Sequence, residues 1–257
     1  MASLWHVAFA QAFGLRLDFV TAVLLFIAVW LVYVVDRLLD VRGLSEDNLT
    51  DATARHRFYA RNARVAWPAV GVVSVAGFMT TMLGGVGRNL VGFGVAMGMI
   101  TLGYLLCVHY QLRWIRKEIA CGVIFSCGTS GSLWVANKGF PDGWCLFAII
   151  MFAGLCSTNC LAIAKVEAQE DAVHDPMAVT HLKSWWIKRL AVVIMIGCLL
   201  SSGLWLVSSN WLFAAMALGW LGLLLIDQQI EGSKNWRRVA ADCCLFTPLP
   251  WLIFLVG

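Results

Sequence analysis

The stretch Trp30-Leu-Val-Tyr-Val-Val-Asp36-Arg-Leu-Leu-Asp40 begins as an apolar helix and ends in two carboxylates. On an α-helix, residues four apart share a face about one turn apart, so Asp36 and Asp40 are expected to point the same way. Two carboxylates held that close repel each other unless a cation lies between them. The pattern therefore indicates either a polar helix end in water or a cation site.

A second acidic pair follows another long apolar segment. Glu167 and Asp171, in Lys165-Val-Glu-Ala-Gln-Glu-Asp171, have the same spacing of four. Glu170 lies on a different helical face from Glu167 and is interpreted as a secondary metal ligand or a loop residue. The recurrence of the pair favours the cation site over two unrelated helix ends.

The composition is that of a membrane protein. The chain is 60% hydrophobic and 13% charged, with a mean hydropathy of +0.78, whereas an ordinary soluble domain is roughly 25% charged. Several apolar runs approach the ~20 residues that a membrane-spanning helix needs. We therefore predict an all-α, polytopic membrane helix bundle. Nine cysteines scattered through apolar segments, without a C-x-x-C motif, argue against a disulfide framework or a zinc site.

Eight segments are predicted to span the membrane, and residues 3–12 are apolar but too short to do so. Residues 3–12 are expected to form either a truncated first helix or an interfacial one. Glycines 92, 94, 98 and 103 are typical of a helix that packs closely against its neighbours. The eight predicted segments are 18–36, 65–84, 90–111, 119–136, 143–164, 190–208, 211–226 and 239–256.

The loops between these segments alternate between charged and nearly neutral, which predicts the topology. The charged loops, all expected on one side, carry 16 of the 19 Lys and Arg residues, leaving only Arg16, Arg88 and Lys138 opposite. The positive-inside rule makes the charged side cytoplasmic. We therefore expect an integral protein of a bacterial inner membrane, with both acidic pairs facing the cytoplasm.

Basic residues accompany both acidic pairs. Carboxylate oxygens suit Mg²⁺, which shares phosphate oxygens, and Arg and Lys bind the remaining phosphate oxygens. The chain lacks G-x-x-x-x-G-K-[ST] and G-x-G-x-x-G, so no nucleotide or nucleic-acid partner is expected. A diphosphate attached to an apolar chain fits a protein embedded in the lipid bilayer better. The basic residues and the amide that we assign to substrate binding are Arg42, Arg55, Arg57, Arg113, Arg116, Lys117, Asn159 and Lys183.

With these residues in place, the chain resembles the UbiA superfamily of intramembrane prenyltransferases over nearly its whole length. Members have nine helices, with Asp-rich motifs ending helices two and six. If residues 3–12 count as the first helix, Asp36 and Asp40 end helix two, and Glu167 and Asp171 follow helix six. The stretches 117–125, 156–160 and 241–248 also resemble a branch of the superfamily.

The resemblance implies one transmembrane domain over residues 1–257 and a prenyl diphosphate substrate. Asp36, Asp40, Glu167 and Asp171 would then be both the catalytic residues and the Mg²⁺ ligands. The family's first motif is N-D-x-x-D-x-x-x-D, and here Val32-Tyr33 replaces the leading Asn-Asp. The expected reaction is prenyl transfer to an aromatic or other lipophilic acceptor.

Two alternatives remain beside prenyl transfer: a terpene cyclase that needs no acceptor, and a non-catalytic lipid-binding protein. Two polar residues within apolar segments bear on the choice. Asp242 is expected either to bond a neighbouring helix or to contact substrate, because a carboxylate in lipid is costly and is usually paired. Asn159 is expected to face the bundle, where it either lines the cavity or packs.

Overall fold

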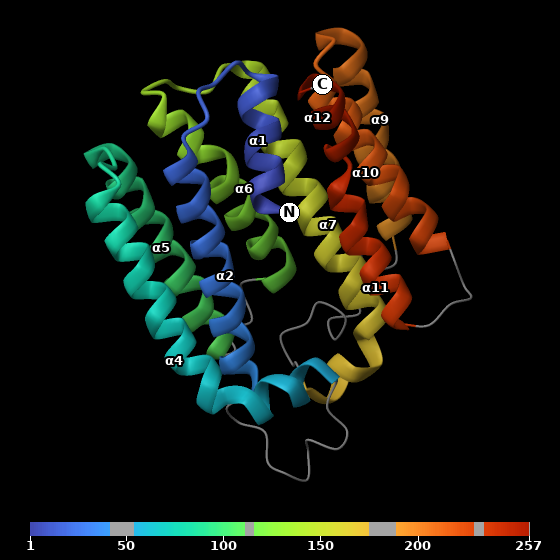
Figure 1. Ribbon diagram of the computed structural model, residues 1–257. Helices are drawn as coiled ribbons and strands as arrows, with labels where there is room; N and C mark the ends of the chain where they lie inside the picture. The colour runs from blue at the N-terminus through green and yellow to red at the C-terminus, as the bar shows by residue number, and fades with distance from the viewer. Residues whose placement is uncertain (42–53, 111–115, 175–188, 229–233, 257) are drawn as a thin grey trace. The chain divides into compact units, whose positions relative to one another are not determined.

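The computed structural model describes residues 1–41, 54–110, 116–174, 189–228 and 234–256 (Figure 1). Within them, the side chains of 54–56, 167–174, 234–235 and 255–256 are not described. The chain divides into two compact units, one formed by Asp18–Leu112 and the other by Met1–Leu17 together with Arg113–Gly257.

The described residues form an all-helical, polytopic membrane protein. Seven helices are long and apolar enough to cross a bilayer, which confirms seven of the eight predicted segments. Their exposed faces are rich in large apolar side chains, such as Leu199, Leu206 and Leu83. Exposed apolar surface on this scale is expected where lipid replaces water as the solvent. The seven candidate spans are Phe19–Val41, Arg57–Leu83, Arg88–His109, Lys117–Ala136, Gly143–Val166, Leu190–Ser208 and Trp211–Gln228.

The unit Asp18–Leu112 contains α2 (Phe19–Val41), α4 (Ala54–Leu83) and α5 (Arg88–His109). Asp18 caps α2, because its Oδ2 accepts hydrogen bonds from the backbone N–H and the hydroxyl of Thr21 at 3.0 and 2.8 Å. α2 packs closely on α4: a Cβ added at Gly77 would lie 3.1 Å from Ile27. The charged N-terminal part of α4, expected as loop, is helical from Ala54.

The glycines predicted to bring 90–111 close to its neighbours do not do so in the described structure. A Cβ added at 92, 94, 98 or 103 would meet nothing within 4 Å. The close approaches occur elsewhere. Gly122 of α6 lies against the backbone of Ser157 in α7, and Gly197 of α9 lies against the ring of Trp220 in α10.

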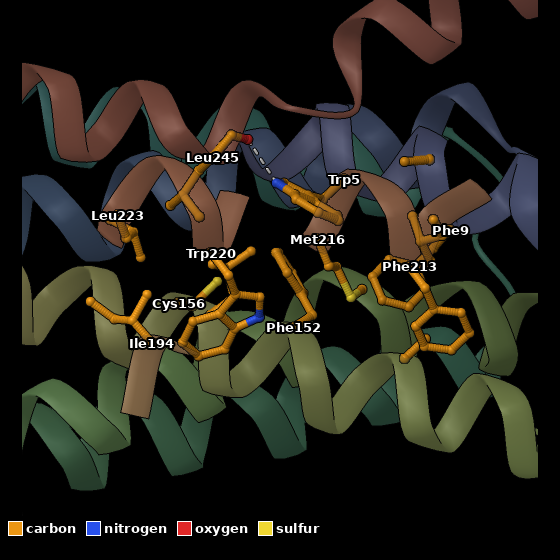
Figure 2. Packing of buried hydrophobic residues seen from close by; sticks show 14 of the residues in the cluster. Trp5, Phe9, Phe152, Cys156, Ile194, Phe213, Met216, Trp220, Leu223 and Leu245 are labelled. Carbon is orange, nitrogen blue, oxygen red and sulfur yellow. Dashed lines mark hydrogen bonds between the residues drawn. The ribbon is translucent and has the colours of Figure 1, made fainter. Parts of the chain in front are cut away.

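The second unit contains α1, α6, α7 and α9–α12. Buried aromatic rings from α1, α7 and α10 fill its core (Figure 2). The ring centroids of Trp5 in α1 and Phe152 in α7 lie 4.3 Å apart. Inside a membrane such packing is favoured by van der Waals contact rather than by expulsion of water. The helices are α1 (Ala2–Ala12), α6 (Lys117–Ala136), α7 (Gly143–His174), α9 (Leu190–Ser208), α10 (Trp211–Gln228), α11 (Lys234–Cys243) and α12 (Leu249–Val256).

The first helix is largely buried within its unit. Trp5, Ala8 and Phe9 of α1 have no exposed surface, and His6 is equally buried, with its Nδ1 2.8 Å from the carbonyl oxygen of Thr129 in α6. Because a carbonyl only accepts, Nδ1 of His6 carries a proton. Of the two expectations for residues 3–12, the truncated first helix is the one that the structure supports.

The predicted segment 239–256 is not one continuous helix. α11 ends at Cys243, a 3₁₀ turn follows over Cys244–Phe246, and α12 begins at Leu249. Pro248 and Pro250 lack the N–H that would bond the carbonyl four residues earlier, which explains the interruption. The indole Nε1 of Trp5 donates to the Leu245 carbonyl at 2.8 Å (Figure 2), so α1 satisfies a backbone group within the break.

Candidate functional site

The first acidic pair lies in the last two turns of α2, which runs to Val41. The arginine between the two acids holds both of them. Arg37 places Nη2 3.3 Å from Oδ2 of Asp36 and Nη1 2.8 Å from Oδ2 of Asp40. These three side chains are only 15–23% exposed. The cation that the sequence required between the two carboxylates is therefore supplied, in this structure, by the chain itself.

An aromatic side chain lies on the same face, one turn earlier. The Cζ of Arg37 is 5.5 Å from the ring centroid of Tyr33, a distance typical of a cation–π contact. The Tyr33 ring meets that of Tyr59 in α4 edge to face, with centroids 6.4 Å apart. The Tyr33 ring thus lies between the guanidinium of Arg37 and a ring of α4.

Arg37 was not among the residues predicted from sequence, although its signal was present. A basic residue three positions before an acid can reach it on a helix, and the pair with Asp40 is such a contact. The contact with Asp36, the preceding residue, is not one that helix spacing predicts.

The second acidic pair lies on helix α7, beyond the apolar part of that helix. Glu167 and Asp171 lie in the final turns of this helix, which ends at His174, so their spacing of four places them on one face. Their side chains are outside the described residues. The first pair belongs to the unit Asp18–Leu112 and the second to the other unit. The expectation that the four acids share metal ions stays a prediction.

The predicted basic residues are distributed over both units. Arg57 is partly buried in the first turn of α4, and Arg116 and Lys117 are partly buried at the start of α6. Glu118, which follows them, is 6% exposed. Arg42, Arg113 and Lys183 lie outside the described residues, and of Arg55 only the backbone is described.

Asn159 and Asp242, the two polar residues within apolar segments, contact each other. Nδ2 of Asn159 in α7 donates to Oδ1 of Asp242 in α11 across 3.5 Å, a long hydrogen bond. Asn159 is 4% exposed, and its Oδ1 accepts no hydrogen bond from any described residue. The expectation that Asp242 bonds a neighbouring helix is confirmed, and the amide oxygen of Asn159 is left with unused accepting capacity.

An ion pair that was not predicted connects the polar ends of α7 and α10. Nζ of Lys165 lies 2.6 Å from Oδ1 of Asp227, whose side chain is 7% exposed. Lys165 lies two positions before Glu167, the first residue of the second acidic pair. The pair fixes the point at which α7 leaves its apolar stretch.

The donor atoms of the first pair suit a hard divalent cation, because carboxylate oxygens are the ligands that Mg²⁺ prefers. Within the described side chains, no group of three or more histidine, cysteine, aspartate or glutamate residues is arranged to hold a metal ion. Glu167 and Asp171 are not among the side chains considered there. The first pair alone offers two carboxylates and a competing guanidinium.

Comparisons with models of protein families, with curated proteins and with solved structures find no match to this chain.

Proposed function

We propose that this protein is a Mg²⁺-dependent intramembrane transferase that ionises an isoprenoid diphosphate and passes the prenyl group to a lipophilic acceptor. One observation carries the proposal: a pair of carboxylates, held with a guanidinium, ends a helix that is apolar enough to span a membrane. Such an end offers donors for a metal and for phosphate beside a bilayer that accommodates the apolar chain. The resemblance described from the sequence points to the same chemistry.

In this proposal Asp36 and Asp40 would hold Mg²⁺, which would supply positive charge to offset that of the departing diphosphate. Arg57, which belongs to the same unit as the first acidic pair, would bind phosphate oxygens. The bond between the prenyl carbon and the diphosphate oxygen breaks, and its electron pair leaves with the diphosphate. The acceptor then forms a bond to the prenyl carbon and loses a proton. Apolar and aromatic side chains exclude water, which would otherwise capture the allylic cation.

The contact between Asn159 and Asp242 supports transfer over cyclisation. A cyclase needs an apolar contour, whereas a transferase must also hold a polar acceptor. A buried amide oxygen without a described donor would accept a hydrogen bond from a hydroxyl group, and an unsatisfied oxygen is otherwise costly in this setting. Asp242, at the other side of the amide, holds Asn159 in place.

The test is release of inorganic diphosphate by the purified protein with Mg²⁺ and geranyl, farnesyl or geranylgeranyl diphosphate. We expect release only when 4-hydroxybenzoate or a quinone precursor is added. Asp36→Ala should abolish it. Asp142→Asn is the matched control: it also removes a carboxylate, but asparagine retains the capping bond that Asp142 makes to the backbone N–H of Cys145 at the other end of α7.

Two results would replace the proposal. Diphosphate release without acceptor, accompanied by a hydrocarbon or terpene alcohol, would identify a cyclase. Absence of release with every chain length, together with diphosphate binding that Asp36→Ala removes, would identify a non-catalytic binder of prenyl lipids.

A further inference from the structure

The guanidinium of Arg37 occupies the position at which a divalent cation would bind the first acidic pair. It contacts Oδ2 of both Asp36 and Asp40, at 3.3 and 2.8 Å. A Mg²⁺ ion bound directly to these oxygens would lie ~2.1 Å from them. Two cations cannot share the same two oxygens at these distances, because their mutual repulsion grows as the separation falls.

The local charge explains why Arg37 lies beside both acids. Two carboxylates one turn apart at the end of an apolar helix carry two negative charges, and Arg37 reduces the sum to one. The three side chains are mostly buried, so the repulsion between the acids is poorly screened by water. The Tyr33 ring, 5.5 Å from the guanidinium carbon, stabilises this position of the cation further.

We propose that Arg37 is an exchangeable counter-ion, which neutralises Asp36 and Asp40 and transfers to the substrate diphosphate when a divalent cation takes the carboxylates. This inference rests on the proposed function. A guanidinium is suited to both positions, because its planar fork of N–H donors binds carboxylate and phosphate with the same geometry. Lysine lacks this planar fork, since its ammonium is a compact point charge.

The exchange links metal binding to substrate binding. A metal ion alone must compete with Arg37 for the carboxylates, so without substrate the protein should bind divalent cations weakly. A diphosphate that arrives with the metal supplies a new partner for Arg37. Arg37 therefore opposes binding of the metal and favours binding of the substrate, which are effects of opposite sign from one side chain.

The experiment measures both effects on the full-length protein in detergent. Mn²⁺ binding is followed by electron paramagnetic resonance of the unbound ion. Binding of geranyl thiolodiphosphate, a substrate analogue with a slowly cleaved bond, is followed by calorimetry at saturating Mg²⁺. The variants are Arg37→Gln, Arg37→Lys and the double variant Asp36→Asn/Asp40→Asn. Arg64→Gln is the matched control, because Arg64 is an exposed arginine of α4 without an ion pair to any described residue.

Arg37→Gln should lower the Kd for Mn²⁺ at least tenfold, because it removes a positive charge ~4 Å from a divalent ion. The same variant should raise the Kd for the analogue about tenfold, because one charge-assisted bond to phosphate is lost. Arg37→Lys should lie between the wild type and Arg37→Gln for Mn²⁺. Arg64→Gln should change neither Kd by more than about twofold, as expected for an exposed charge.

If Arg37→Gln tightens Mn²⁺ binding but does not weaken analogue binding, Arg37 does not transfer to the phosphate. If Arg37→Gln leaves Mn²⁺ binding unchanged or weakens it, Arg37 does not compete with the metal ion for the carboxylates. If the double variant Asp36→Asn/Asp40→Asn binds Mn²⁺ as tightly as the wild type, the ion does not bind these carboxylates. That result would overturn the inference as a whole. Failure of the proposed function gives a different result: both effects of Arg37→Gln on binding are observed, but the protein releases no diphosphate. Circular dichroism tests whether each variant is folded. If Arg37→Gln does not fold, the two dissociation constants of Arg37→Lys are compared with those of the wild type instead.

Discussion

Replacing Gly197 by alanine should destabilise the protein, although alanine is the better helix former. A Cβ at this position would lie 2.5–2.7 Å from three ring atoms of Trp220. The ring cannot move away freely, because it is 3% exposed and Gly154 of α7 lies on it, with an added Cβ there only 3.5 Å from the ring. One of the packed helices must therefore shift.

The magnitude follows from two opposing terms. Overpacking of a filled core costs about 1–3 kcal/mol, and three contacts below 3 Å place this site at the upper end. Replacing glycine by alanine within a helix contributes about 1 kcal/mol in the other direction. The net loss should be about 2 kcal/mol. Gly203→Ala, in the same helix with nothing within 4 Å of an added Cβ, carries only the favourable term.

The difference between the two alanine variants isolates the contact with Trp220, at about 3 kcal/mol. For a chain of this size that corresponds to about 6–12 °C in Tm. The measurement is unfolding in mixed micelles with increasing sodium dodecyl sulfate, followed by circular dichroism. In a protein that already carries Trp220→Leu, Gly197→Ala should cost much less stability than it does in the wild type, because the ring that the added Cβ would meet is gone. Equal effects of Gly197→Ala and Gly203→Ala would refute the reasoning.

Three further outcomes are expected. Trp5→Phe should cost about 1–3 kcal/mol, because it leaves a carbonyl in the α11–α12 break without its donor while keeping most of the ring contact; an unchanged unfolding curve would contradict this. Lys165→Met should lower the unfolding midpoint by leaving the carboxylate of Asp227 buried without its partner, and adding Asp227→Asn should restore much of it; a further loss in the double variant would count against the ion pair. With the native cysteines replaced, single cysteines at Asn48 and Asn137 should react with impermeant reagents from opposite sides of the membrane, and reaction of both from one side would remove the predicted topology.

The sequence predicted the spanning helices well because their signal is local. Twenty apolar residues in a row indicate a spanning helix whatever surrounds them. The prediction of one continuous helix over 239–256 was wrong, because hydropathy does not reflect the missing N–H groups of Pro248 and Pro250. The burial of α1 was not predictable from its length, since it depends on Phe152 and Leu245, which are distant in the chain.

The candidate site was predictable in part for the same reason. The spacing of Asp36 and Asp40 is a local property of one helix, and the structure retains it. Their partner was adjacent in sequence, yet its role depends on side-chain geometry: whether Arg37 turns toward both acids is decided by burial and by the Tyr33 ring. The contact between Asn159 and Asp242 joins residues 83 positions apart, which no local pattern indicates.

The bond from Trp5 to the carbonyl of Leu245 has a consequence for biogenesis. It joins residues 240 positions apart, and the helices of the unit Asp18–Leu112 are made between them. At a synthesis rate of about 5–20 residues per second, α1 waits about 12–48 s for this partner. During that interval its indole N–H lacks the acceptor that it has in the finished protein. A chain arrested before Leu245 is made would present α1 to whatever assists insertion, so α1 is secured well after its own synthesis.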